Sequence, residues 1–245
     1  MAPVRVNAVI QARLSSTRLP GKVLRPLGGR TVLSWVIRAA QETRNLDAVI
    51  LATSDDPSDD PVAEEAARCG AAVVRGPLDD VLARYLKAVR EHPCDAVVRL
   101  TADCPLHDPA LIAQVVGMWL ADPALDHVSN VVVRRYPRGF DAELVRVPVL
   151  EEQDRVATGA HREHVTSNIH TQPTVYRTGG VVPGVDNSDL RVTLDTEEDA
   201  KLLDGVVAAL GDGVPRWADV VALLRSRPDL VALNADVEQK ALPTA

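Results

Sequence analysis

Apolar runs alternate with longer amphipathic stretches along the first half of the chain. The run D-A-V-I-L-A-T at 47–53 is one example, and the stretch 31–43, which a threonine opens, has helical spacing of its apolar residues. Continuous apolar strands separated by helices are typical of a parallel sheet that is covered on both faces. The pattern predicts strands at 4–11, 47–53, 71–74 and 95–101 and helices at 31–43, 57–69, 77–91 and 108–121.

The pattern changes after residue 122, where the apolar runs become shorter and alternate with polar residues. Such alternation is typical of strands that expose one face, which occur in antiparallel sheets. We therefore expect a smaller antiparallel insertion, and a tail from residue 234 without periodicity. The expected strands are 127–133, 140–147, 174–177 and 190–194, and the expected helices are 148–155, 161–168, 196–210, 217–225 and 228–233.

The fold class that these elements predict is α/β, with a mostly parallel sheet. A chain of 245 residues is long enough for one large domain or two small ones. The sequence contains no internal repeat and no low-complexity linker, which favours a single domain over 1–245. We divide this domain into the parts 1–122, 123–195 and 196–245.

The composition argues against a nucleic-acid partner and against a membrane location. The chain carries 27 basic and 34 acidic residues, a net charge of −7, and 3% aromatic residues. Nucleic-acid binders are usually basic and often stack bases on aromatic side chains, so we expect no nucleic-acid partner. Three cysteines without a C-x-x-C pair indicate reduced thiols, and no apolar stretch approaches the ~18 residues of a membrane span. We expect a cytoplasmic protein without a membrane contact.

One loop departs from this acidic balance. The segment Q-A-R-L-S-S-T-R-L-P-G-K at 11–22 follows the first strand and carries Arg13, Arg18 and Lys22 beside several hydroxyl groups. Ligands of doubly wound sheets bind at the carboxyl ends of the strands, and this loop suits a polyphosphate there. It has neither the Walker spacing nor G-x-G-x-x-G. A solvated basic loop is the alternative interpretation.

Two carboxylates follow strand-like runs and complete a candidate site. Asp103 lies in T-A-D-C-P and Asp195 lies in R-V-T-L-D-T-E-E-D, in which Thr196 is free to cap the next helix. Asp103 alone fits a turn into the next helix equally well. Together with the basic loop, the two aspartates are a plausible site for Mg²⁺ and a triphosphate.

These motifs resemble a known family. Q-A-R-L-S-S-T-R-L-P-G-K-V-L, R-L-T-A-D-C-P-L, Y-P-R-G-F-D-A-E, R-E-H-V-T and R-V-T-L-D-T-E-E-D resemble, in order, the cytidylyltransferases that make CMP-activated sugar acids. The likeness covers most of 4–205 and is greatest for the branch of spore coat polysaccharide synthesis proteins. It implies a three-layer, GT-A-like nucleotide-diphospho-sugar transferase fold, usually as a homodimer. T-A-D-C-P replaces the Q-G-D-E-P of the sugar-acid enzymes, so their acceptor contacts are not assumed.

The resemblance also implies roles for particular residues. Lys22 and Arg13 would hold the triphosphate and act in catalysis with Asp103 and Asp195, and the two aspartates would bind Mg²⁺. The region 1–122 would be the nucleotide-binding half. The candidate nucleotide-binding residues are Gln11, Ala12, Arg13, Leu14, Ser16, Arg18, Lys22, Thr53, Arg75, Gly76, Thr101 and Asp103.

Two further motifs, at 136–143 and 161–170, are candidates for the acceptor. Their charged residues fit either an acceptor pocket or a polar strand face, and those of the second motif also fit a dimer contact. Several histidines there invite a zinc interpretation, but H-x-x-H lacks the H-E-x-x-H spacing and is a weak signal. The candidate acceptor-binding residues are Arg138, Asp141, Glu143, Arg162, Glu163 and His164.

The favoured function is a Mg²⁺-dependent transfer of CMP from CTP to a small anionic acceptor, with release of pyrophosphate. A sugar acid or a phosphonate fits, because arginines such as Arg134 and Arg138 suit either anion. The alternative is a GT-A-type glycosyltransferase with a nucleotide-sugar donor, although D-C-P replaces the D-x-D motif of those enzymes. A nucleotide-sensing protein without activity is a third interpretation, which the presence of both aspartates and Lys22 disfavours.

Overall fold

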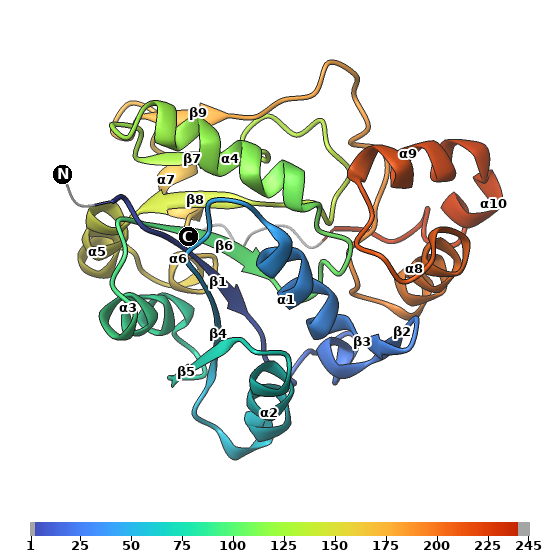
Figure 1. Cartoon of the computed structure of the whole chain (residues 1–245), viewed down its shortest axis with the longest axis horizontal. Helices are drawn as coiled ribbons and strands as arrows, with labels where there is room; N and C mark the ends of the chain where they lie inside the picture. Colours follow the sequence, from blue (N-terminus) through green and yellow to red (C-terminus); the bar gives the residue numbers. More distant parts are fainter. Residues whose placement is uncertain (1–2, 240–245) are drawn as a thin grey trace.

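A seven-stranded mixed sheet forms the centre of the computed structural model, which describes residues 3–239 (Figure 1). The strand order is β5-β4-β1-β6-β8-β7-β9. The strands are β1 (Val6–Gln11), β4 (Ala48–Ser54), β5 (Ala72–Gly76), β6 (Ala96–Thr101), β7 (His127–Ser129), β8 (Glu143–Arg146) and β9 (Thr178–Gly180).

The sheet is mostly parallel, as the sequence predicts. β5, β4, β1 and β6 are parallel neighbours, whereas β8 pairs antiparallel with both β6 and β7. Gln11, at the end of β1, lies opposite Ala52 of β4 and Thr101 of β6. The loops that follow β1 and β6 therefore start side by side at one edge of the sheet.

Helices cover both faces of the sheet, which confirms the expected α/β class. Ala8 and Ile10 of β1 pack in one core cluster with α1, α2 and α4, whereas Val9 packs on the opposite face with α3 and α5. The helices are α1 (Val32–Glu42), α2 (Asp60–Arg68), α3 (Val81–Glu91), α4 (Pro109–Ala121), α5 (Val147–Val156), α6 (Ala160–Glu163), α7 (Ser167–His170), α8 (Glu197–Leu210), α9 (Trp217–Ser226) and α10 (Pro228–Val231).

The C-terminal helices α8, α9 and α10 form a third core cluster beside the sheet (Figure 1). They share it with a short ribbon of β2 (Pro26–Leu27) and β3 (Arg30–Thr31). Two 3₁₀ turns, η1 (Lys22–Leu24) and η2 (Pro57–Asp59), complete the elements. Within the described range, no helix combines the length and the apolar character that a membrane crossing needs.

Side-chain caps fix the starts of several helices where the sequence places polar residues. Thr31 Oγ1 accepts a hydrogen bond from Ser34 N at 3.1 Å, which confirms the expected threonine cap of α1. Thr196 caps α8 in a reciprocal pair with Asp199. The second cap also holds the chain just after Asp195, a predicted site residue.

Several predicted boundaries in the second half are wrong. The apolar residues of 130–133 form a turn, and the strand predicted at 174–177 is a turn that precedes β9. The helix predicted at 161–168 is divided into α6 and α7 around Val165, whose φ is 23°. The short apolar runs at 130–133 and 174–177 fit a strand or a buried turn equally well, so periodicity could not decide between them. The segment 161–168 has one apolar residue, so its pattern gave little evidence for an unbroken helix.

The strand predicted at 190–194 is also wrong, although the segment is extended. Its hydrogen bonds go to loops: Val192 N donates to Arg138 O at 2.7 Å, and Leu194 N donates to Asp103 O at 2.8 Å. An isolated bridge between Arg138 and Arg191 replaces a ladder. The segment thus joins the loop that carries Asp103 to the start of α8.

Gly139 lies where this segment crosses the loop after β7. Its φ is 109°, and a Cβ atom there would lie 2.7 Å from Val192 C and 2.8 Å from Thr193 N. We expect Gly139→Ala to lower the free energy of unfolding by about 3 kcal/mol, because strain and a clash with fixed backbone add. Denaturant unfolding measures this. Gly184→Ala, which meets nothing within 4 Å, is the control; equal effects of the two variants would contradict the account.

Candidate active site

The basic loop folds back on itself before it reaches η1. Leu14 N donates to Asp59 Oδ1 at 2.7 Å, and Gly21 N donates to Leu14 O at 3.1 Å. Gly21 has a φ of 72°, which a residue without a side chain adopts at little cost. This closed loop directs Lys22 towards the loop after β6.

Lys22 joins the two aspartates that the sequence predicts as a pair. Its Nζ lies 2.8 Å from Asp103 Oδ2 and 2.7 Å from Asp195 Oδ1. The side chains of Lys22 and Asp195 are 11% and 10% exposed, and that of Asp103 is 28% exposed. Two carboxylate oxygens therefore converge on one cationic position at the edge of the sheet.

Burial and charge act against each other in this cluster. Burial favours the neutral form of Lys22, but the charges of Asp103 and Asp195 outweigh it and raise the pKa of the ammonium group. Burial likewise opposes ionisation of Asp103, but Lys22 lowers the pKa of that carboxyl to about 2. Lys22 and Asp103 are thus both charged near neutral pH.

The lowered pKa of Asp103 predicts a loss of stability in acid. The folded pKa of Asp103, about 2, is below its usual value of 3.8, so its contribution is complete above that value and is lost as the pH falls towards about 2. Asp103→Asn should therefore lower the free energy of unfolding at neutral pH by more than at pH 3. Denaturant unfolding over this range measures the difference. A difference that stays constant down to about pH 3 would contradict the assignment.

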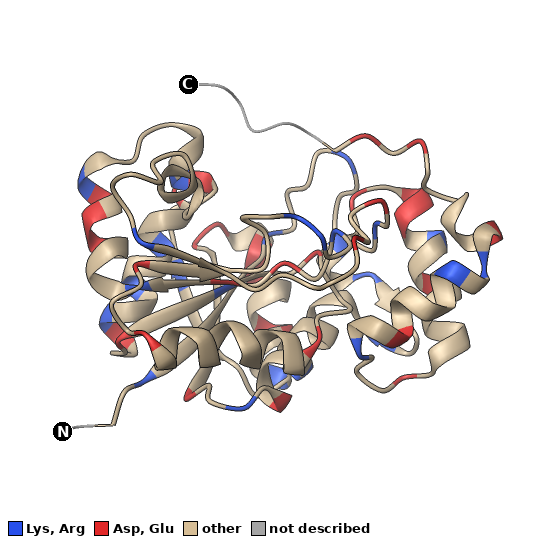
Figure 2. Cartoon of the chain, turned by 90° about the horizontal axis from the view of Figure 1, so that it is seen from above, with Lys and Arg blue, Asp and Glu red and all other residues tan. Residues whose placement is uncertain are grey.

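Asp195 lies in a denser group of charges than Asp103. Figure 2 shows charged residues of both signs where the sheet meets the C-terminal helices. Arg18 Nη2 and Arg191 Nη2 lie 3.0 and 2.8 Å from Asp195 Oδ2. Arg191 also binds Asp199, the buried capping residue of α8, at 2.9 Å. Removal of Arg191 would leave Asp199 buried without its cation, so this arginine positions Asp195 through a fixed ion-pair network.

The structure brings part of the predicted acceptor set to the nucleotide loop. Arg13 Nη2 lies 3.0 Å from Glu163 Oε1, which joins the loop after β1 to α6. Asp141 forms two hydrogen bonds of 2.8 Å with Arg134. His164 is half-buried, and burial followed by the charge of Arg99 lowers its pKa. The Arg13–Glu163 ion pair thus joins the predicted nucleotide and acceptor sets directly.

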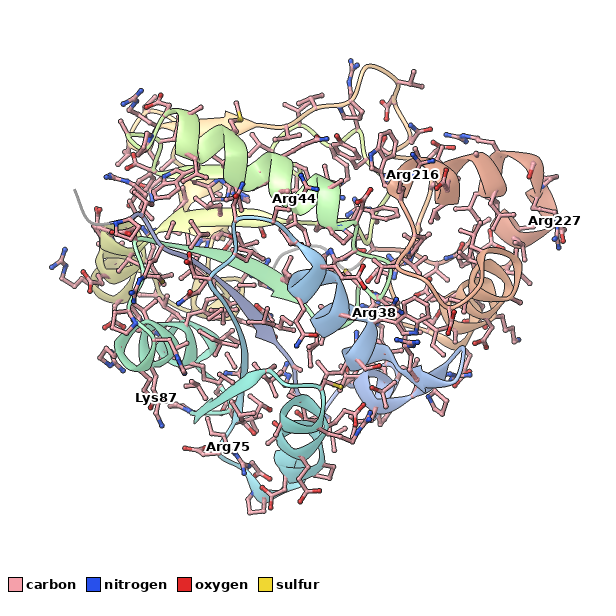
Figure 3. The ribbon with its side chains drawn as sticks, viewed as in Figure 1. Arg38, Arg44, Arg75, Lys87, Arg216 and Arg227 are labelled. Atoms are coloured by element: carbon pink, nitrogen blue, oxygen red, sulfur yellow. The ribbon has the colours of Figure 1, made fainter. Side chains whose placement is uncertain are left out.

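Other predicted residues have contacts that hold the scaffold. Arg162 binds both Asp80, which caps α3, and Asp154 of α5, each within 2.8 Å. Arg75 lies on the edge strand β5 (Figure 3), where its side chain donates to Ser54 O at the end of β4 and to Asp56 and Asp60 in the segment that follows. Arg162 and Arg75 thus fix loops around the site in this structure.

The remaining predicted residues lie along the strand ends and in the loops after them. Gln11 Oε1 accepts from Arg99 Nε at 3.1 Å, and Thr101 Oγ1 lies 3.3 Å from Cys104 Sγ. Ala12, Thr53 and Gly76 are buried, whereas Ser16 and Arg138 are partly exposed.

Arg84 is a buried residue near the site that the sequence analysis did not select. It is 1% exposed, and its Nε and Nη1 have no hydrogen-bond partner among residues 3–239. Its Cγ would lie 3.1 Å from a Cβ atom built on Gly76, so it packs against the end of β5. Burial, together with the charge of Arg13, lowers the pKa of Arg84. An arginine on the apolar face of a predicted helix was the signal that could have identified it.

Comparisons with known proteins identify the family of this chain. Residues 7–207 match the cytidylyltransferase family. The spore coat polysaccharide biosynthesis protein SpsF of Bacillus subtilis is 30% identical over 230 residues, which are 90% of this chain and 94% of SpsF. A solved cytidylyltransferase from Leptospira borgpetersenii superposes with a TM-score of 0.91 at 27% identity, over 98% of this chain and 100% of that one.

A more distant structure shows the fold alone. CMP:2-keto-3-deoxy-manno-octonic acid synthetase, solved with CTP, has a TM-score of 0.64 at 16% identity, over 84% of this chain and 99% of that one. This likeness confirms the expected nucleotidyltransferase architecture. The family match covers most of the sequence and includes the strand-end loops that hold Lys22, Asp103 and Asp195. The chain therefore belongs to the cytidylyltransferase family of enzymes.

Proposed function

We propose that this chain transfers CMP from CTP to a small anionic acceptor in a Mg²⁺-dependent reaction that releases pyrophosphate. The observation that carries the proposal is the convergence of Asp103 and Asp195 on Lys22 Nζ, at 2.8 and 2.7 Å, beside a basic loop. In a cytidylyltransferase this arrangement fits a triphosphate that loses its two outer phosphates. The CTP held by the octonic acid synthetase structure supports cytidine as the base.

The basic loop has a role in positioning and in charge neutralisation. An acceptor oxygen attacks the α-phosphorus in line, the bond from that phosphorus to the bridging oxygen breaks, and pyrophosphate leaves. Lys22, Arg13 and Arg18 lie on one loop and at its end, so they can neutralise charge that accumulates on the leaving group. No covalent intermediate with the protein is needed.

The two aspartates fit a magnesium site. Carboxylate oxygens are the donors that Mg²⁺ prefers, and Oδ2 of Asp103 and Oδ1 of Asp195 already converge on one cation. Mg²⁺ bound there would supply charge stabilisation for the transferred phosphoryl group. Lys22 occupies the same place in this structure, so its ammonium group must move when a metal binds, which frees it for the phosphates.

We place the anionic acceptor near Arg138. Burial is the largest cause that lowers the pKa of Arg138, and the charge of the nearby Arg134 lowers it further. No ion pair of Arg138 is found within the described residues. An arginine without a carboxylate partner suits an anionic acceptor such as a sugar acid or a phosphonate. The polysaccharide pathway in the name of the SpsF relative favours a sugar acid. We also propose a homodimer and a cytoplasmic location.

The test is pyrophosphate release with Mg²⁺ and each of the four nucleoside triphosphates, against pooled sugar acids, sugar phosphates and phosphonates. We expect release with CTP and with one acceptor class. Release of a nucleoside diphosphate from a nucleotide-sugar would instead support the glycosyltransferase alternative. Failure to bind CTP would overturn the proposal.

A further inference from the structure

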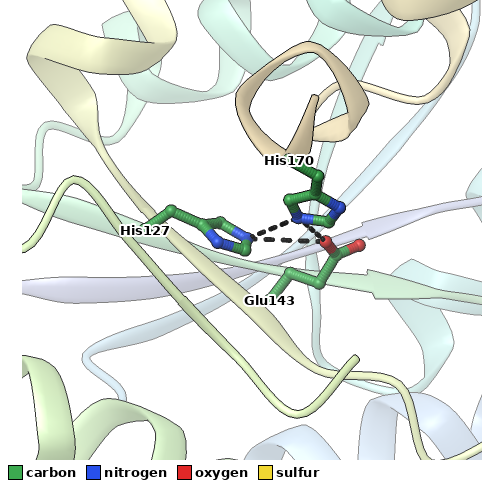
Figure 4. A group of neighbouring side chains, drawn as sticks. All are labelled: His127, Glu143 and His170. Carbon is green, nitrogen blue, oxygen red and sulfur yellow. Dashed lines mark hydrogen bonds and ion pairs between the residues drawn. The ribbon is translucent and has the colours of Figure 1, made fainter. Parts of the chain in front are cut away.

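A second group of potential ligands lies away from the aspartate pair. His127 of β7, Glu143 of β8 and His170 of α7 point towards one another (Figure 4). Their side chains are 0%, 6% and 27% exposed, so the group is buried on the strands and reaches solvent on the side of α7. Two imidazoles and one carboxylate are the ligand set of many zinc sites.

The spacing of the three donor atoms matches that of ligands around one metal ion. Glu143 Oε2 lies 3.4 Å from His127 Nε2 and 3.0 Å from His170 Nε2, and the two nitrogens are 3.1 Å apart. Tetrahedral zinc with bonds of about 2.0–2.1 Å separates its ligand atoms by about 3.3 Å. A single ion can therefore contact all three atoms with little movement of the side chains.

The two Nε2 atoms present either N–H groups or lone pairs to Glu143 Oε2, depending on the tautomers of the histidines. The ionised Glu143 carboxylate only accepts hydrogen bonds, and one proton at most fits between the two Nε2 atoms. With a proton on each Nε2, both imidazoles donate to Glu143 Oε2. With both Nε2 atoms deprotonated, two nitrogen lone pairs and one carboxylate oxygen face the same point, as ligands do around a cation. The second nitrogen of His127, Nδ1, is buried without a partner in the described part of the chain. A cation at the centre satisfies all three lone pairs at once.

Neighbouring residues hold Glu143 in the orientation that a metal needs. Arg99 Nη1 binds Oε1 at 2.6 Å and leaves Oε2 directed at the histidines. Thr166 Oγ1 donates to that Oε2 at 2.9 Å. Outer contacts of this kind orient ligands in metal sites.

We propose that His127, Glu143 and His170 bind a Zn²⁺ ion, in a site separate from the magnesium pair. Two nitrogen donors suit zinc better than magnesium, which prefers oxygen. The site joins α7 to β7 and β8 and assigns Glu143 to the metal rather than to the acceptor. The proposed zinc ligands do not include the neighbouring H-x-x-H motif, in which His161 Nδ1 lies 2.8 Å from Ser167 Oγ.

The test is zinc binding by the full chain after chelation, measured by dialysis and elemental analysis in excess Mg²⁺. We expect about one Zn²⁺ per chain. His170→Ala should weaken binding by more than about 100-fold, since loss of an outer contact alone costs about 10–100-fold. His170 is partly exposed, so this variant retains the fold more readily than changes at Glu143.

Two controls separate this site from others. His161→Ala removes a histidine of the same segment and should retain zinc, and Asp103→Asn changes the magnesium pair and should retain it as well. Absence of zinc from the wild-type chain, equal binding by His170→Ala, or loss of zinc in Asp103→Asn would overturn the proposal. The readout is bound metal, so its outcome is independent of pyrophosphate release.

Discussion

Asp103→Asn is expected to lower kcat for pyrophosphate release by at least about 10³-fold at saturating CTP, because it removes one of two oxygen ligands and halves the local negative charge. Lys22 retains its 2.7 Å contact with Asp195, so the loop keeps an anchor in the variant. Steady-state rates as a function of Mg²⁺ concentration measure both the loss and any weaker metal dependence.

The control for this variant is Asp219→Asn. Asp219 forms an exposed ion pair with Arg216 on α9 and lies outside the proposed site. We expect its kcat to be unchanged. If Asp103→Asn keeps wild-type kcat at the same Mg²⁺ concentration, Asp103 is not a metal ligand in the reaction and the proposed site is wrong.

Lys22→Ala is expected to lower kcat by about 10²–10³-fold and to raise KM for CTP by less. The reason is that charge increases on the leaving pyrophosphate in the transition state, so the ammonium contributes more there than in the bound substrate. Steady-state kinetics with CTP as the varied substrate separate the two parameters.

Lys201→Ala is the matched control, because Lys201 is an exposed lysine on α8. It should leave both parameters unchanged. An unaltered kcat with a higher KM in Lys22→Ala would show that Lys22 contributes only to ground-state binding of CTP, and would remove its catalytic role.

The sequence predicts the parts of the site that follow from strand periodicity. Continuous apolar runs identify β1 and β6, and the parallel order of these strands brings the loops that follow them to one edge. That rule brings the loops that carry Lys22 and Asp103 together, whereas the contact itself depends on how the basic loop closes at Gly21. Asp195 was identified from its motif, although the segment before it makes loop contacts instead of the predicted strand.

The remaining contacts depend on register and on loop closure, which periodicity does not specify. Arg99 pairs with Glu143 because the antiparallel register of β6 and β8 places them opposite each other. His127 reaches Glu143 from the neighbouring strand β7, and His170 reaches it from α7. Short apolar runs in this half fit several conformations, so the predicted strands there were too long and the histidine–glutamate group was not found.

The most direct test of CMP transfer follows the α-phosphorus of CTP. The wild-type chain is incubated with Mg²⁺, CTP radiolabelled at that phosphorus and an acceptor that supports pyrophosphate release. The products are then separated and their masses are measured by mass spectrometry. We expect the label to join the acceptor as CMP, with one unlabelled pyrophosphate released for each product. Label that stays in a nucleoside diphosphate, or acceptor that never carries it, would contradict nucleotidyl transfer.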